Sequence, residues 1–162
     1  MKKYFILLAV ALVVGFTACN KDQDDDEPNK PATDVTTSIA GVYTGEIKLA
    51  ESVVAQDVAI TLTREDDTQM TISMNETIEV PLMGQLPLDV QCENALVTLS
   101  GQTYTVSGET AVALDLGTGL TDYNVDIIGT VENDAADFAI TITMGVAPIT
   151  VQFTGTKNIT EP

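Results

Sequence analysis

The sequence predicts an all-β fold in which an antiparallel sheet closes into a barrel of about eight strands. Three observations support this prediction. From about residue 39 onwards, apolar residues alternate with polar ones over short segments, turns rich in polar residues or glycine separate the segments, and no window of eleven residues keeps a helical stripe. About nine or ten such segments in one open sheet would leave two exposed edges, and closure removes both.

The strands are expected in order along the chain, each with every second side chain on one face. The first opens at Gly41 and runs through Tyr43. A hairpin follows, with apolar residues at 58, 60 and 62 on one arm, at 70, 72 and 74 on the other, and a polar tip at 65–68. The same alternation returns in segments 86–90, 96–99, 104–106, 112–114, 123–127, 138–144 and 149–153. Threonine fills the opposite face of several strands, as expected of a β-branched residue on a half-exposed sheet.

The composition limits the partners of the protein. The chain has 162 residues, a formal charge of −17, no His and no Trp. A field this negative repels phosphate, so we expect no nucleic-acid partner. Because aromatic residues are scarce, the core must be built mainly from Val, Ile, Leu and Met.

The N-terminus has the layout of an export signal. Met1 to Lys3 supply positive charge, and an apolar run from Tyr4 to Phe16 precedes Cys19. As a helix that run spans about 20 Å, too short for the roughly 30 Å of a bilayer core. Phe16-Thr17-Ala18-Cys19 resembles a bacterial lipobox, with Phe16 in place of the usual Leu. The resemblance implies that residues 1–18 are a cleaved signal peptide and that Cys19 carries diacylglycerol and fatty acyl chains such as palmitate. The alternative is an ordinary signal peptide.

Residues 19–38 are expected to form a flexible tether, because acids and prolines crowd together and apolar residues are nearly absent. The acids resemble the export tags that follow the lipidated Cys in surface lipoproteins of Bacteroides-type bacteria. The alternative is a solvated spacer. A calcium loop is not expected, since Glu27 stands where the loop needs Gly. The possible export tag comprises Asp22, Asp24, Asp25, Asp26 and Glu27.

The remaining chain resembles the calycin-like β-barrel domain of Bacteroides-group lipoproteins, distant relatives of lipocalins. The likeness rests on Gly41-Val42-Tyr43-Thr44-Gly45, on the strand 60–63 and on Phe153-Thr154-Gly155-Thr156-Lys157. It implies a barrel domain over residues 39–158, a tail over 159–162, and closure by Gly41, Tyr43, Phe153 and Lys157. Lys157 would lie over the Tyr43 ring as a cation–π pair, and Phe153 would point inward beside Val42 or Ile47. The resemblance transfers no catalytic residues.

The sequence does not indicate an enzyme. Without His, and with Arg64 as its single Arg, the chain cannot assemble the usual nucleophile triads. No metal or cofactor is expected, and Cys92 would be left alone once Cys19 is lipidated. A remote alternative is a carboxylate glycoside hydrolase that uses two of Asp115, Asp122 and Asp126.

We therefore expect a lipid-anchored outer-membrane protein with a non-enzymatic binding or accessory barrel, facing either the cell surface or the periplasm. In one version the barrel encloses a small apolar ligand, with Met70, Met74 and Met144 lining a pocket and the segment 81–84 as a lid. For these two features we favour methionines that fill gaps in the core and a segment 81–84 that covers the bottom of the barrel. In the alternative, side chains fill the interior and the loops or outer strands bind another envelope protein or a polymer.

Overall fold

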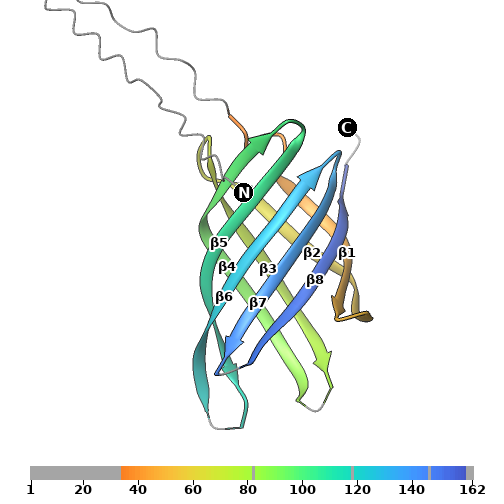
Figure 1. Ribbon diagram of the computed structural model, residues 1–162, viewed down its shortest axis with the longest axis vertical. Coiled ribbons are helices and arrows are strands. Elements are labelled where there is room, and N and C mark those ends of the chain that lie inside the picture. The colour runs from red at the N-terminus through yellow and green to blue at the C-terminus, as the bar shows by residue number, and fades with distance from the viewer. Residues whose placement is uncertain (1–33, 82, 118, 146, 160–162) are drawn as a thin grey trace, which may run out of the picture. The chain divides into compact units, whose positions relative to one another are not determined.

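The computed structural model describes residues 34–81, 83–117, 119–145 and 147–159, which form a closed eight-stranded barrel (Figure 1). Each strand pairs antiparallel with the next, and the first also pairs with the last. The predicted fold class is thereby confirmed. The strands are β1 (Gly41–Leu49), β2 (Ser52–Arg64), β3 (Gln69–Val80), β4 (Gly84–Ser100), β5 (Thr103–Asp115), β6 (Leu120–Glu132), β7 (Ala135–Met144) and β8 (Ala147–Lys157).

The strands are fewer and longer than the nine or ten short segments of the sequence pattern. The segments 86–90 and 96–99 belong to one strand, β4, which is 17 residues long, and the segments 104–106 and 112–114 both belong to β5. Ile72 of β3 lies opposite Cys92, but Met70 lies opposite Ala95, so β4 carries one extra residue at this point. This is a β-bulge, and Asn94 within it has a positive φ of 56°. Before the bulge the even-numbered residues of β4, up to Cys92, point inward, and after it the odd-numbered residues do, beginning with Ala95. This change in the alternation made one strand look like two.

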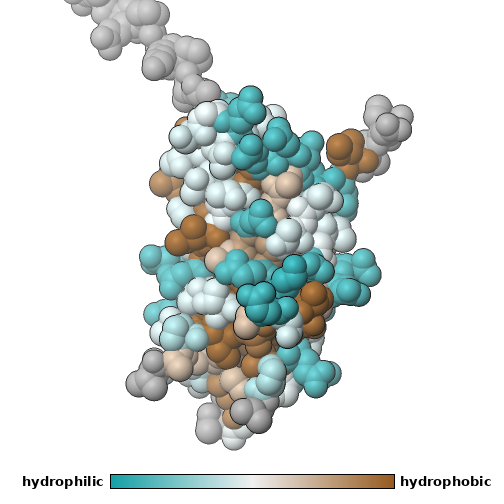
Figure 2. Space-filling model, turned by 45° about the vertical axis from the view of Figure 1, so that its right-hand side comes forward, coloured by the Kyte–Doolittle hydropathy of each residue, from teal (hydrophilic) through white to brown (hydrophobic). Residues whose placement is uncertain are grey.

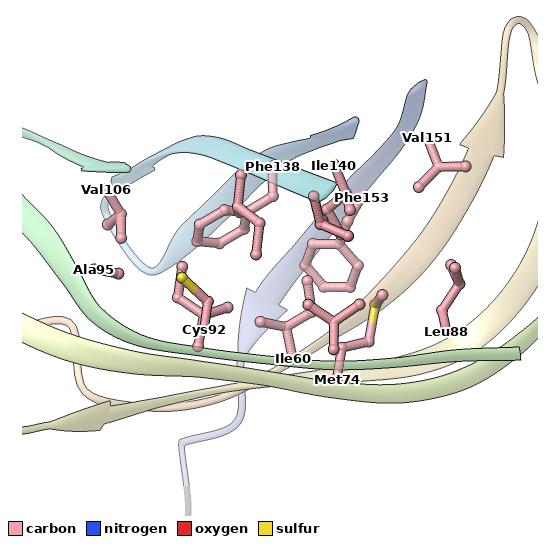
Figure 3. Packing of buried hydrophobic residues seen from close by; sticks show 14 of the residues in the cluster. Ile60, Met74, Leu88, Cys92, Ala95, Val106, Phe138, Ile140, Val151 and Phe153 are labelled. Carbon is pink, nitrogen blue, oxygen red and sulfur yellow. The ribbon is translucent and has the colours of Figure 1, made fainter. Parts of the chain in front are cut away.

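The barrel interior is packed with apolar side chains from all eight strands (Figure 3). Phe138 and Phe153 lie at its centre with their ring centroids 6.4 Å apart. Gly129 and Gly155 make room for them, because a Cβ on either glycine would strike the neighbouring Phe ring. The alternation read from the sequence therefore describes most of the core correctly, with apolar residues inside and polar residues outside, although Leu96 and Leu99 of the segment 96–99 are exposed.

One end of the barrel is closed by the residues that precede β1. Val35 and Ile39 are buried in the core cluster, and Thr36 is fully buried. The Thr36 hydroxyl donates to the carbonyl oxygen of Asp66 at 2.5 Å, which joins this segment to the β2–β3 turn. Residues 34–38 were assigned to the tether from the sequence, but in the structure Val35 and Thr36 belong to the packed domain. We call residues 34–40 the end segment.

Charged groups hold the end segment in place from outside. The Asp34 carboxylate accepts hydrogen bonds from the hydroxyl and the amide of Thr37, at 2.6 and 3.0 Å. These bonds, with weaker ones from Thr36, hold the pKa of Asp34 well below its usual range. Arg64 lies 3.4 Å from Asp34 and 2.6 Å from Asp67. The single Arg of the chain thus links the end segment to the hairpin beside it.

Candidate functional site

The four predicted closure residues come together at the seam between β1 and β8. Tyr43 lies opposite Lys157, and Ile47 lies opposite Phe153. Phe153 is fully buried and points inward beside Ile47, one of its two predicted neighbours. The alternative neighbour, Val42, is 37% exposed and turns outward.

The polar tips of Tyr43 and Lys157 bind the end segment. The buried Tyr43 hydroxyl donates to the carbonyl oxygen of Ile39 at 2.8 Å, and the Lys157 ammonium donates to that of Ser38 at 2.9 Å. The Lys157 stem lies so close to Gly41 that a Cβ there would approach its Cε to 2.8 Å. These carbonyl contacts take the place of the expected cation–π pair. Burial raises the pKa of Tyr43 to about 12, and the negative charge of Asp134 adds to the increase.

Cys19 and the possible export tag at 22–27 lie outside the described residues, so lipidation and export stay predictions.

Met70 and Met74 are buried and help to fill the core, whereas Met144 is only partly buried. At the tip of the β3–β4 hairpin, Pro81 is exposed and Met83 is 44% exposed, so these side chains do not pack as a cover over the interior.

The three candidate catalytic aspartates lie on the outer surface of β5 and β6, where Asp115 is opposite Leu120, two residues from Asp122 on the same face. The Asp115 carboxylate accepts from the amides of Gly117 and Gly119, at 2.8 and 3.0 Å, and so shapes the β5–β6 turn. Asp122 and Asp126 lie on β6 four residues apart on one face, a separation of about 13 Å. The Asp122–Asp126 separation exceeds the roughly 5 to 10 Å between paired carboxylates of glycosidases. Asp115 and Asp122 are diagonal neighbours about 7 to 8 Å apart, but the Asp115 carboxylate is already bound to the turn amides.

Charge is distributed unevenly around the barrel. No Lys or Arg occurs from Glu65 to Thr156, while acids recur throughout this stretch. The cations of the described residues lie on three adjoining strands, with Lys157 on β8, Lys48 on β1 and Arg64 on β2. The outer surface of β3 to β7 therefore carries only negative charges.

An open depression of about 570 Å³ lies within this negative surface, on β5, β6 and β7. Glu109 and Asp126 lie directly opposite each other there, on neighbouring strands. Two like charges in such a cross-strand pair repel each other, and a cation between them would relieve the repulsion. Ile128 is 60% exposed beside them. We call this region the acidic face, and its lining residues are Ser107, Gly108, Glu109, Asp126, Ile127, Ile128 and Thr141.

A second depression of about 570 Å³ lies on the outside of the β1–β8 seam, next to Gly45, Asp57 and Gly155. Of its two acids, Glu46 and Asp57, Glu46 already pairs with Lys48 at 2.6 Å. No salt bridge involves Glu109 or Asp126 within the part of the chain that the structure describes. The acidic face is therefore the better candidate for binding a partner.

Sequence reasoning missed the acidic face because Glu109 and Asp126 are far apart in the chain. Only the register of β5 against β6 brings them together. One sequence signal was available, namely the long stretch without any cation. That stretch indicates a negative surface but not the strands on which the carboxylates meet.

The described residues include no helix long and apolar enough to cross a membrane. No protein-family model matches the chain, and no curated protein matches it by sequence. The fold is similar to a crystal structure from Bacteroides fragilis, of a protein named provisionally as an outer membrane protein. The TM-score is 0.55 at 15% sequence identity, and the match covers 77% of this chain and 53% of that one. At this identity the likeness shows a shared barrel fold, and the match spans about half of the other protein.

Proposed function

We propose that this chain is a lipid-anchored outer-membrane lipoprotein of the calycin-like type, whose barrel is a non-enzymatic module that binds another envelope protein. The observation that carries this proposal is the contrast between a packed interior and an exposed acidic face. Glu109, Asp126 and Ile128 offer charge and apolar area on the outside, where a macromolecular partner can reach them.

The packed interior supports surface binding over enclosure of a small apolar ligand. Phe138, Phe153, Met70 and Met74 occupy the volume that a ligand would need (Figure 3). An eight-stranded barrel is just wide enough for its own side chains to fill it. Binding inside would require several of these side chains to move.

The charges on the outside support a barrel surrounded by water at the end of a tether. Barrels embedded in a membrane carry an outward apolar band about 25 Å tall. On the face shown in Figure 2, hydrophilic side chains are interspersed with hydrophobic areas and no continuous apolar band is seen. The lipobox at Cys19 supports attachment by lipid, and the acids that follow support display at the cell surface. Exposed outward acids on the strands include Glu79, Asp89, Glu93, Asp122 and Asp137.

Site-specific photo-crosslinking in intact cells tests the proposal. A photoreactive amino acid at Ile128 should yield one discrete protein adduct, because this side chain is 60% exposed on the acidic face. Val42 is the matched control, since it is also an exposed β-branched residue but lies on β1. Equal adducts from both positions, or none from Ile128, would contradict the proposal. An apolar molecule that copurifies in stoichiometric amount would favour the small-ligand function instead.

A further inference from the structure

The strands β4 and β5 pair over less than half of their length. The register joins them through five residue pairs, from Leu96 with Ser107 to Ser100 with Thr103. Beyond these pairs β4 extends to Gly84, paired only with β3, and β5 extends to Asp115, paired only with β6. The two strands diverge over these stretches (Figure 1). Each therefore has a backbone edge without a strand partner.

The contacts where the strands part show which backbone groups face the split. The carbonyl oxygen of Glu109 lies 3.6 Å from the Cys92 sulfur, and that of Gln91 accepts the Thr110 hydroxyl at 2.7 Å. Backbone groups of alternate residues point to the same side of a strand. On β5, the amides and carbonyls of Ala111, Ala113 and Asp115 therefore face the split, away from β6.

The free edges of β4 and β2 are blunted, whereas that of β5 is not. On the free edge of β3, over residues 75–80, the Thr77 amide already donates to the Glu76 carboxylate at 2.9 Å. On β4 the alternation turns the nitrogen of Pro87 toward the split, so that edge lacks a donor. The free edge of β2 is bent by Asp57, whose φ is 58°. In contrast, β5 pairs with β6 from Tyr104 to Asp115 without a register shift, and contains no Pro or Lys there. Residues 108–115, which we call the β5 edge, can thus accept a strand.

The side chains around the β5 edge select the charge of that strand. Glu109 and Asp115 lie on the edge, and Asp122 and Asp126 lie on β6 beside it. Between the acids, the exposed residues Ala111 and Ala113 are small and leave room for another chain. No cation of this protein lies on β4, β5 or β6 to neutralise these charges.

We propose that the β5 edge binds an extended, cationic peptide segment of a partner protein by antiparallel strand addition. Backbone hydrogen bonds from alternate residues of β5 hold the segment, and its basic side chains meet the carboxylates of the acidic face. This inference rests on the proposed function, for which it names the site and the class of partner.

The test uses the full chain and a labelled decapeptide of alternating Lys and Thr. Binding should slow hydrogen exchange at the amides of Ala111 and Ala113. Ala113→Pro removes one edge donor without touching the β6 ladder, and should weaken binding at least about tenfold. Thr77→Pro is the matched control on the free edge of β3, where the Thr77 amide donates to the Glu76 carboxylate at 2.9 Å rather than to β4. It should bind like the parent.

A second variant guards against misfolding of Ala113→Pro. Glu109→Gln combined with Asp126→Asn leaves the backbone unchanged and should also weaken binding about tenfold at low salt. Equal loss in Ala113→Pro and Thr77→Pro, or binding without protection of the β5 amides, would overturn strand addition. If Ala113→Pro retains the crosslink from Ile128 in cells, the inference fails while the proposed function stands.

Discussion

Tyr43 is fully buried although it carries a hydroxyl, and its position is fixed by the Ile39 carbonyl oxygen 2.8 Å away. A buried hydroxyl without a partner would be costly, so the end segment and Tyr43 stabilise each other. Phe153 acts differently, through volume alone. Its ring fills the space above Gly155 and meets Phe138 at 6.4 Å between centroids.

Truncation of Phe153 to Ala should lower the free energy of unfolding by about 3 to 5 kcal/mol, because a fully buried ring leaves a cavity. Thr154→Ala, on the exposed side of the same strand, should cost under about 0.5 kcal/mol. Denaturant titration measures both. Similar small losses would mean that the interior collapses around the gap.

Stability should fall at high pH because of Tyr43. Its pKa is about 12 in the folded protein and about 10 when unfolded, so the unfolded state ionises first. The contribution is fully present below pH 10 and is lost as the pH rises toward 12, by up to about 2 kcal/mol. Tyr43→Phe should be less stable at pH 8 but should lose less stability between pH 10 and 12. Equal slopes for the two proteins would refute this role.

At the scale of elements, the β4 bulge decides how the sheet closes. It changes which residues of β4 point inward, from Cys92 before the bulge to Ala95 after it. Next to it, Gly108 of β5 lies so close that a Cβ there would strike the Cys92 sulfur. The pairing of β4 with β5 ends beside this contact. Bulge and glycine together therefore place the point at which the two strands part.

Asn94 should tolerate Gly but not Val. Its φ of 56° is accessible to Asn and Gly, whereas a β-branched residue is strained there. Asn94→Val should lower the free energy of unfolding by about 1 to 2 kcal/mol, and Asn94→Gly should change it little. Urea titration distinguishes the two variants. A Val variant as stable as the parent would show that the bulge can move along β4.

At the scale of the whole molecule, the predicted lipid anchor would hold a strongly negative protein at the membrane. A chain of charge −17 is repelled by anionic headgroups. A lipid at Cys19 would keep the protein at the membrane in spite of this repulsion. The acidic face would then remain accessible to a cationic partner.

Replacement of Cys19 by Ala should release the protein from membranes into the soluble fraction, because two acyl chains are needed for stable attachment. Detergent phase partitioning and the mass of the mature chain measure this. A variant that matures and partitions like the parent would refute the lipobox assignment.

Replacement of Asp24, Asp25 and Asp26 by Ala should remove the protein from the cell surface while leaving it lipidated and folded. Protease treatment of intact cells measures surface exposure, and Lys21→Ala provides a control within the same segment. If accessibility is unchanged, the acids are a spacer and not an export tag.

The sequence alone determined the properties that depend on local alternation and on composition. The alternation with a period of two predicts the inward residues, such as Ile60, Met74, Phe138 and Phe153. The large number of predicted strands favours a closed antiparallel barrel, because an open sheet would leave two exposed edges. The meeting of Tyr43 with Lys157 was also predicted, though not the carbonyls that their polar tips bind.

Only the tertiary structure decided the number of strands and the position of the candidate site. The β4 bulge, the Glu109–Asp126 pair and the split beside β5 all depend on register between strands. Register is set by packing across the barrel, where a shift of one residue turns every side chain to the other face. Alternation within a single strand contains no information about its neighbour, so these features appear only when the strands are brought together.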